Sequence, residues 1–332
     1  MHRRQVLALL SVPVTGFAAG CGGQGTTETE TPTATTTESP TDTETPTATA
    51  TETPTETPTA TETATPGGPE REGNAAIAEV EKTLNNVVAV YGGPDSDSLL
   101  GTDASSAEFE SGRIQGSLSE AEEELDVARE RVVTRQQERT VDRLAVTIRF
   151  LDLATQIQIA LNNAFFALDR ARAALSEEEG SDARERLQRM ENERRLAVPL
   201  LEQLRSETDA ASVSVIDRID TTAYEAKVAQ FSAEISTMRR LRSPAETLSR
   251  GVDRLQTARQ QEANNSDSAA ETASQAVEQL QSAETGLRNV LEGIGDDAAS
   301  LQPITTQLVE MAATKTRDAR EIAGETTATP TS

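Results

Sequence analysis

Apolar residues recur along most of this 332-residue chain at steps of three and four, the spacing that places them on one face of an α-helix. The spacing is clearest where Leu118, Ala121, Leu125, Ala128 and Val132 follow one another. No segment shows the alternation of apolar and polar residues that a half-buried strand would need. The pattern therefore predicts an all-α protein of about seven helices.

Glycine and proline predict where several of these helices end. Gly92-Gly93-Pro94 would end the first helix, and a loop rich in Gly, Ser and Asp would run on to about Gly116. Towards the other end of the chain, Gly293 or Gly295 would end the sixth helix and Gly324 the last one. These positions divide the apolar pattern into separate helical segments.

Capping residues predict where helices begin. The tetrads Ser117-Leu118-Ser119-Glu120 and Ser243-Pro244-Ala245-Glu246 both combine a serine with a glutamate three residues later, and Ser268-Ala269-Ala270-Glu271 opens the next predicted helix in the same way. Apolar stripes then line the predicted helices over residues 77–91, 118–175, 187–204, 216–238, 248–255, 273–291 and 301–322.

Residues 117–179 form the longest candidate element. They contain no Gly or Pro, so a single helix of about 90 Å could form at 1.5 Å per residue, although the polar interval 134–140 leaves two helices as the alternative. Residues 144–175 are apolar on more than one face, and we expect them at the centre of the fold. Arg149, Asp152 and Asp169 argue against a membrane-spanning role for this stretch.

Short predicted turns between successive helices favour an elongated antiparallel bundle with coiled-coil-like packing. A parallel coiled-coil oligomer is the competing architecture, because the same heptad-like steps would serve either arrangement. The frequent caps and turns favour the folded-back bundle.

A low-complexity linker precedes the helices. Residues 26–66 consist of Thr, acidic residues, Pro, Ala and one Ser, and they contain no basic residue. Such a segment cannot bury enough apolar area to offset its chain entropy, so we expect a disordered, extended stalk, with threonines that could carry O-linked sugars. The predicted organisation is therefore a signal peptide (1–20), a linker (21–69), a helical domain (70–324) and a disordered tail (325–332).

The segment before the linker has the features of an export signal. Two arginines, Arg3 and Arg4, precede an apolar run that is too short to span a bilayer, and the run ends in Ala18-Ala19-Gly20 directly before Cys21. This segment resembles the signal of twin-arginine-exported, lipobox-containing lipoproteins. The resemblance implies cleavage between Gly20 and Cys21 and a lipid on the Cys21 sulfur. An ordinary signal peptide and an uncleaved helical anchor are the alternatives.

Acidic side chains outnumber basic ones by 55 to 31, a net charge of −24. Residues 1–69 hold 2 basic and 8 acidic side chains, which leaves 29 and 47 in the rest of the chain, a net charge of −18. Scarce lysine and abundant glutamate resemble the proteins of halophilic archaea, in whose molar salt the Debye length is only about 3 Å. A particular cation site formed by these carboxylates is the alternative. So negative a chain repels phosphate backbones, which argues against nucleic-acid binding.

Cysteine and histidine each occur once, as Cys21 and His2. This excludes an intrachain disulfide, zinc sites built on Cys or His, a di-iron helix-bundle site and a Ser-His-Asp mechanism. An EF-hand is excluded because the segment that starts with Asp95 has Ser106 where the bidentate glutamate would be needed. We therefore assign no catalytic residue, no metal ligand and no cofactor, and a hydrolase that uses only carboxylates is the remaining enzymatic option.

Three asparagines are candidates for specific contacts. Asn162 and Asn163 lie within the apolar stretch, where they would line a pocket or hydrogen-bond across helices. Asn264 begins an N-glycosylation sequon, Asn264-Asn265-Ser266, in a predicted interhelical turn.

Together these features predict a non-catalytic surface protein. The lipid on Cys21 would anchor it to the outer face of the cytoplasmic membrane, and the helical domain would act as a scaffold or bind a protein partner at the cell surface. The alternative is a ligand- or cation-binding lipoprotein that serves a transporter or sensor.

Overall fold

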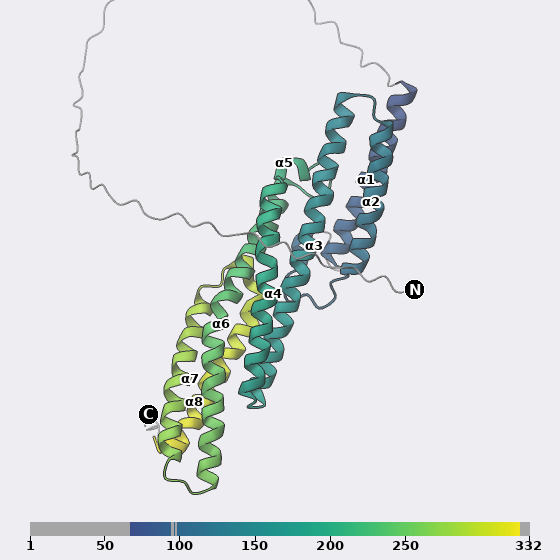
Figure 1. Cartoon of the computed structure of the whole chain (residues 1–332). Helices are drawn as coiled ribbons and strands as arrows, with labels where there is room; N and C mark the ends of the chain where they lie inside the picture. The colour runs from purple at the N-terminus through teal and green to yellow at the C-terminus, as the bar shows by residue number, and fades with distance from the viewer. Residues whose placement is uncertain (1–66, 94–95, 97, 326–332) are drawn as a thin grey trace, which may run out of the picture. The chain divides into compact units, whose positions relative to one another are not determined.

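The structure is a computed structural model that describes residues 67–93, 96 and 98–325. These residues form an all-α helical bundle and contain no strand (Figure 1). Its elements are α1 (Gly68–Gly92), η1 (Leu99–Gly101), α2 (Ser111–Arg131), α3 (Arg135–Ser176), α4 (Gly180–Glu207), α5 (Ala210–Val213), α6 (Thr221–Ala263), α7 (Ala269–Glu292), η2 (Asp296–Leu301) and α8 (Gln302–Ala323), where η marks a 3₁₀ helix.

Helix α3 lies at the centre, as its apolar pattern predicted, and it packs against α1, α2, α4, α5, α6 and α8. An 18-residue window of α3 is apolar and long enough to cross a membrane, but 67% of that window is buried inside the bundle. Burial of this extent is what a core helix of a folded bundle shows, so the composition of α3 is explained by its packing.

The helices fall into two packing sets. Helices α1 to α5 pack among themselves, and α6, α7 and α8 lie side by side in the second set (Figure 1). The two sets meet mainly where α4 packs against α6, with further contacts from α3 and η1 to α6. Polar side chains concentrate along this junction, and the candidate site described below lies on it.

Residues 117–179 form two helices, separated at residues 132–134. A capping box begins α3: the Thr134 side chain accepts a hydrogen bond from the Gln137 backbone N–H, and the Gln137 side chain accepts one from the Thr134 N–H. The Gln137 amide also donates to the Glu70 carbonyl and to the Asn74 side chain in α1, both at 2.8 Å. The polar interval therefore contains a helix start that is tied to a neighbouring helix.

Both tetrads proposed as N-caps lie inside helices, so those two predictions were wrong. Helix α2 already begins at Ser111, because buried Ile114 continues the apolar stripe one turn before Leu118. Helix α6 runs through Pro244 without ending. A side chain at Gly286 of α7 would meet the Pro244 Cβ at 2.9 Å, so the two helices approach closely here. We attribute the continuation to this packing, which offsets the roughly 3 kcal/mol that an interior proline costs.

Other predicted helix ends are confirmed. Gly93 follows α1 with a positive φ of 83°, Gly293 caps α7, and Gly324 ends α8 in the left-handed conformation. Ser268 precedes α7, although its side chain makes no capping hydrogen bond. The merging of two predicted helices into α6, the split at residues 132–134 and the short α5 change the count from about seven to eight α-helices in the described part of the chain.

Candidate functional site

The candidate site begins with an unusual stripe on α6. Tyr224, Lys227, Phe231, Glu234 and Met238 follow one another at steps of three and four, and all five are buried. Lys227 and Glu234 are both 0% exposed. Two charged residues therefore occupy core positions, where a charge is tolerated only when other polar groups satisfy it.

The Lys227 ammonium is surrounded by oxygen atoms and aromatic rings. Its Nζ donates to the Thr102 carbonyl at 2.6 Å, to Gln230 Oε1 at 3.0 Å and to Gln158 Oε1 at 3.2 Å. It also lies 4.7 Å from the ring centroid of Phe231 and 5.1 Å from that of Tyr91. The three oxygens match the three donors of an ammonium group. Lys227 is therefore fully satisfied by groups from α3, from α6 and from the loop that precedes α2.

Glu234 is satisfied on one oxygen only. Its Oε1 accepts a hydrogen bond from the Ala104 N–H at 3.0 Å and one from the Ser300 hydroxyl at 3.0 Å. Its Oε2 is buried and has no hydrogen-bond partner among the described residues. A buried polar atom without a partner costs stability, and such atoms are uncommon in folded proteins.

Burial has opposite effects on the two groups. Desolvation lowers the pKa of Lys227 from 10.5 to about 7, although the charges of Glu234 and Asp103 oppose this shift. Desolvation raises the pKa of Glu234 from 4.5 to about 7, against the effects of the Ala104 N–H and the Lys227 charge. Both groups are thus placed to exchange protons near neutral pH, which is a frequent property of functional sites.

The loop between η1 and α2 covers this network and is held by α3. Asn162 donates to the Ser106 carbonyl at 2.6 Å and to the Ala104 carbonyl at 3.3 Å. Gln158 donates to the Asp103 carbonyl at 2.6 Å and to Asn162 Oδ1 at 2.9 Å. The loop therefore presents Asp103 and Ala104 to α6 in a defined position.

A pocket of about 270 Å³ opens beside Glu234, between this loop, α6 and η2. Four carboxyl groups line it: buried Glu234, half-buried Asp103 and the exposed Asp296 and Asp297. Its remaining walls come from Gln230, Ser300 and three apolar residues, Leu100, Ala226 and Ala299. The pocket combines negative charge with apolar walls, and one of its lining carboxylates, Glu234, has a buried oxygen without a partner.

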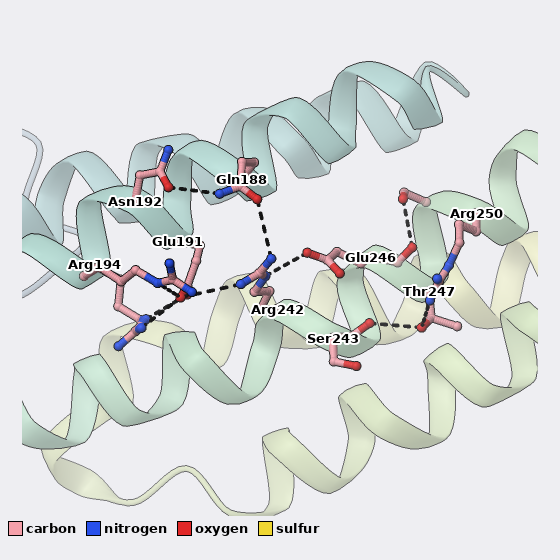
Figure 2. Close-up of polar contacts among 11 residues, drawn as sticks. Gln188, Glu191, Asn192, Arg194, Arg242, Ser243, Glu246, Thr247 and Arg250 are labelled. Atoms are coloured by element: carbon pink, nitrogen blue, oxygen red, sulfur yellow. Dashed lines mark hydrogen bonds and ion pairs between the residues drawn. The ribbon is translucent and has the colours of Figure 1, made fainter. Parts of the chain in front are cut away.

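A second polar cluster joins α4 to α6 and is fully paired (Figure 2). Glu191 accepts two hydrogen bonds from Arg194, both at 2.9 Å, and one from Arg195 at 2.6 Å, while Arg242 of α6 lies 3.6 Å from it. The hydrogen bonds from Arg194, followed by those from Arg195, lower the pKa of Glu191 to about 2 despite its burial. This carboxylate stays ionised and joins the two helices.

A third cluster joins the end of α3 to α6 and α8. Glu178 accepts hydrogen bonds from Arg259 and Lys315, and Arg259 also pairs with Asp318 at 2.9 Å. Desolvation alone would raise the pKa of Glu178, but the hydrogen bonds and charges of Arg259 and Lys315 outweigh it and lower the pKa below its usual value. Because each partner is matched, we read this cluster and that of Glu191 as contacts between helices, and the Glu234 pocket as the candidate site.

The residues singled out from the sequence lie in different places. Cys21, Gly20, Arg3 and Arg4 are outside the described residues, as are Asp95 and Asp97 of the rejected calcium loop. Asn162 belongs to the network around Lys227, whereas Asn163 is exposed and its amide lies 3.5 Å from Glu193 of α4. Asn264 is exposed in the turn between α6 and α7, next to Asn265, whose φ is 50°.

Sequence reasoning missed Lys227 and Glu234, yet a signal was present. The apolar residues Val228, Phe231, Ile235 and Met238 fit a helical stripe only with a slip in phase after Ala226. The slip disappears when Lys227 and Glu234 are placed on the stripe, because Tyr224, Lys227, Phe231, Glu234 and Met238 then keep regular steps. A break in an otherwise regular apolar pattern can thus indicate buried charge.

Comparison with protein-family models, with curated proteins and with solved structures finds no match to this chain. Among the described residues, no three His, Cys, Asp or Glu side chains come close enough to hold a metal ion.

Proposed function

We propose that this chain is a lipid-anchored, extracytoplasmic binding protein without catalytic function. The lipid on Cys21 anchors it to the outer face of the cytoplasmic membrane, the linker over residues 26–66 holds the bundle away from the lipid, and the bundle serves as a scaffold or binds a protein partner. The order of the parts carries the proposal: the single cysteine follows Ala18-Ala19-Gly20, and a Thr- and Pro-rich linker separates it from an all-α bundle.

The acidity of the chain supports a salt-rich setting. The excess of carboxylates extends over the helical part, and several of its ion pairs are exposed pairs within one helix, such as Lys82 with Glu79 and Arg129 with Asp126. Such pairs contribute little to stability, at most about 1 kcal/mol each, so the net repulsion must be screened by the solvent. The protein should therefore lose helicity when salt is reduced from molar to millimolar concentration, as followed by circular dichroism.

Mass spectrometry of the membrane fraction tests the anchor. We expect a mature N-terminus at Cys21 that carries a lipid, and a Cys21→Ser variant that leaves the membrane fraction. Gly23→Ser, two residues further on, is the matched control and should remain in the membrane. An intact peptide that spans Met1 to Cys21 in the wild-type protein would contradict the proposed localisation.

The Glu234 pocket favours a second candidate function, the binding of a small ligand. An unpaired carboxylate oxygen beside a pocket is a group that a ligand could satisfy, and such convergent polar groups with perturbed pKa values are common in binding sites. Binding at this pocket is compatible with the anchored protein proposed above and with a role beside a transporter or sensor.

A further inference from the structure

We propose that the Glu234 pocket binds a small organic ammonium ion, such as an alkyl diamine, whose N–H groups donate to the free oxygen of Glu234. This inference deepens the small-ligand function proposed above and depends on it. It is independent of the lipid anchor.

Glu234 has a buried oxygen atom that a ligand could satisfy. Glu234 Oε1 already accepts two hydrogen bonds, whereas Oε2 has no partner among the described residues, although the side chain is 0% exposed. A protein gains nothing from such an atom unless something else satisfies it. The residue is among those that line a pocket, so it lies beside a space that a ligand can enter.

The lining of the pocket is acidic. Asp103, Asp296 and Asp297 surround the pocket, and no arginine or lysine is among its lining residues. Lys227 is not among the lining residues, and its three donors are already taken by Thr102, Gln158 and Gln230. The pocket therefore attracts a cation and offers an anion no donor with a positive charge.

The spacing of the carboxylates favours an organic cation over a metal ion. A metal ion needs several oxygen ligands within about 2.6 Å of one point, and no group of three carboxylates in the described part of the chain gathers in this way. An ammonium ion accepts more widely spaced partners, because each N–H makes its own hydrogen bond. The apolar side chains of Leu100, Ala226 and Ala299 would contact methylene groups of the ligand.

The size of the pocket limits the ligand. A volume of about 270 Å³ corresponds to on the order of nine water molecules at ~30 Å³ each, so it fits a molecule with few non-hydrogen atoms. A diamine would place one ammonium group at Glu234 and the other between Asp296 and Asp297 at the mouth. A bare divalent ion would make no contact with the apolar walls.

Calorimetric titration of the full chain with putrescine tests the proposal, with butanediol as an uncharged ligand of the same length and calcium chloride as the metal alternative. We expect putrescine to bind, butanediol not to bind, and calcium to bind more weakly than putrescine. Glu234→Gln should weaken putrescine binding by about tenfold to a hundredfold, the effect of removing one charged hydrogen-bond acceptor.

Two further variants separate the pocket from general charge. Glu225→Gln removes one exposed carboxylate from the same helix outside the pocket and should leave putrescine affinity unchanged. The double variant Asp296→Asn and Asp297→Asn changes only exposed positions and should weaken binding even if Glu234→Gln disturbs the fold.

Three results would overturn the proposal: no heat of binding with putrescine, equal losses with Glu234→Gln and Glu225→Gln, or tighter binding of calcium than of putrescine. Detection of the Cys21 lipid on the same preparation keeps the two questions apart. If the protein carries the lipid but does not bind putrescine, the proposed ligand is refuted and the proposed lipid anchor is not.

Discussion

Replacement of Glu234 by glutamine should change how the stability of the bundle depends on pH. Glutamine keeps an oxygen that can accept the hydrogen bonds of Ala104 and Ser300, which are both 3.0 Å from Glu234 Oε1 in the wild-type protein. It places an amide group where the unpaired oxygen lies, and it cannot ionise. The variant should therefore fold, and its core lacks the titrating carboxyl group of Glu234.

The magnitude follows from the pKa of Glu234, which burial raises from 4.5 to about 7. The folded state holds this proton more tightly than the unfolded chain does. The resulting contribution to stability is fully present below pH 4.5 and is lost as the pH rises through about 7. At 1.36 kcal/mol per pKa unit, the loss amounts to about 3 kcal/mol, and a fully buried group needs no reduction for solvent screening.

Few other groups complicate this pH range. The only histidine of the chain is His2, so the bundle has no imidazole that titrates between pH 4.5 and 7. The charged groups around Glu234 are Lys227 on the same helix, Asp103 on the loop before α2, and Asp296 and Asp297 on η2. In the wild-type protein the lowered pKa of Lys227 changes stability above pH 7, where loss of the proton relieves the cost of its burial. The charge of Glu234 raises this pKa, so in Glu234→Gln the pKa of Lys227 falls further and makes the two stability curves diverge in the same direction.

Urea unfolding followed by circular dichroism across this pH range is the appropriate assay. The free energy of unfolding of the wild-type protein should fall by about 3 kcal/mol more than that of Glu234→Gln between pH 4.5 and 7. The comparison uses the change in the free energy of unfolding with pH, so an effect of the amide that is the same at every pH cancels. Parallel curves for the two proteins would show that Glu234 titrates normally and would refute the reasoning.

Two further predictions concern contacts that hold helices in place. Glu191→Gln should destabilise the bundle by about 3 kcal/mol, because it leaves Arg194 buried without its ion-pair partner, whereas the exposed Glu185→Gln should change stability by less than about 0.5 kcal/mol in the same urea assay. Thr134→Ala should cost about 1 kcal/mol by removing the cap on the Gln137 N–H. The control is Thr222→Ala, which changes an exposed threonine that does not cap a helix. The thermal midpoint of Thr134→Ala should be lower than that of this control, and equal midpoints would contradict the role of the cap.

The sequence was a good guide to the helices and a poor one to their polar interior. Regular apolar steps predicted the all-α bundle, the central place of α3 and the glycine ends of α1, α7 and α8, because these depend on neighbours within a few residues. The prediction that a helix begins at Ser243 was wrong, because the packing of α6 on α7 outweighed the local capping sequence.

The candidate site could not be predicted in the same way, since its partners are distant in sequence. Lys227 bonds to Thr102, which lies 125 residues earlier, and Glu234 bonds to Ala104, 130 residues earlier. A sequence rule assigns such charges to the exposed face of a helix. Only the folded chain shows that a loop and α3 supply the groups that make their burial tolerable.

The Glu234 carboxylate has one more consequence, which concerns cooperativity. The N–H of Ala104 belongs to the first packing set and the hydroxyl of Ser300 to the second, and both donate to the same oxygen atom. Helix α6, which carries this atom, also packs against helices of both sets. Unfolding of the first set would remove a donor and a packing partner from α6, and unfolding of the second set would remove the acceptor from the Ala104 N–H. This oxygen atom therefore helps to make the bundle unfold as a single unit.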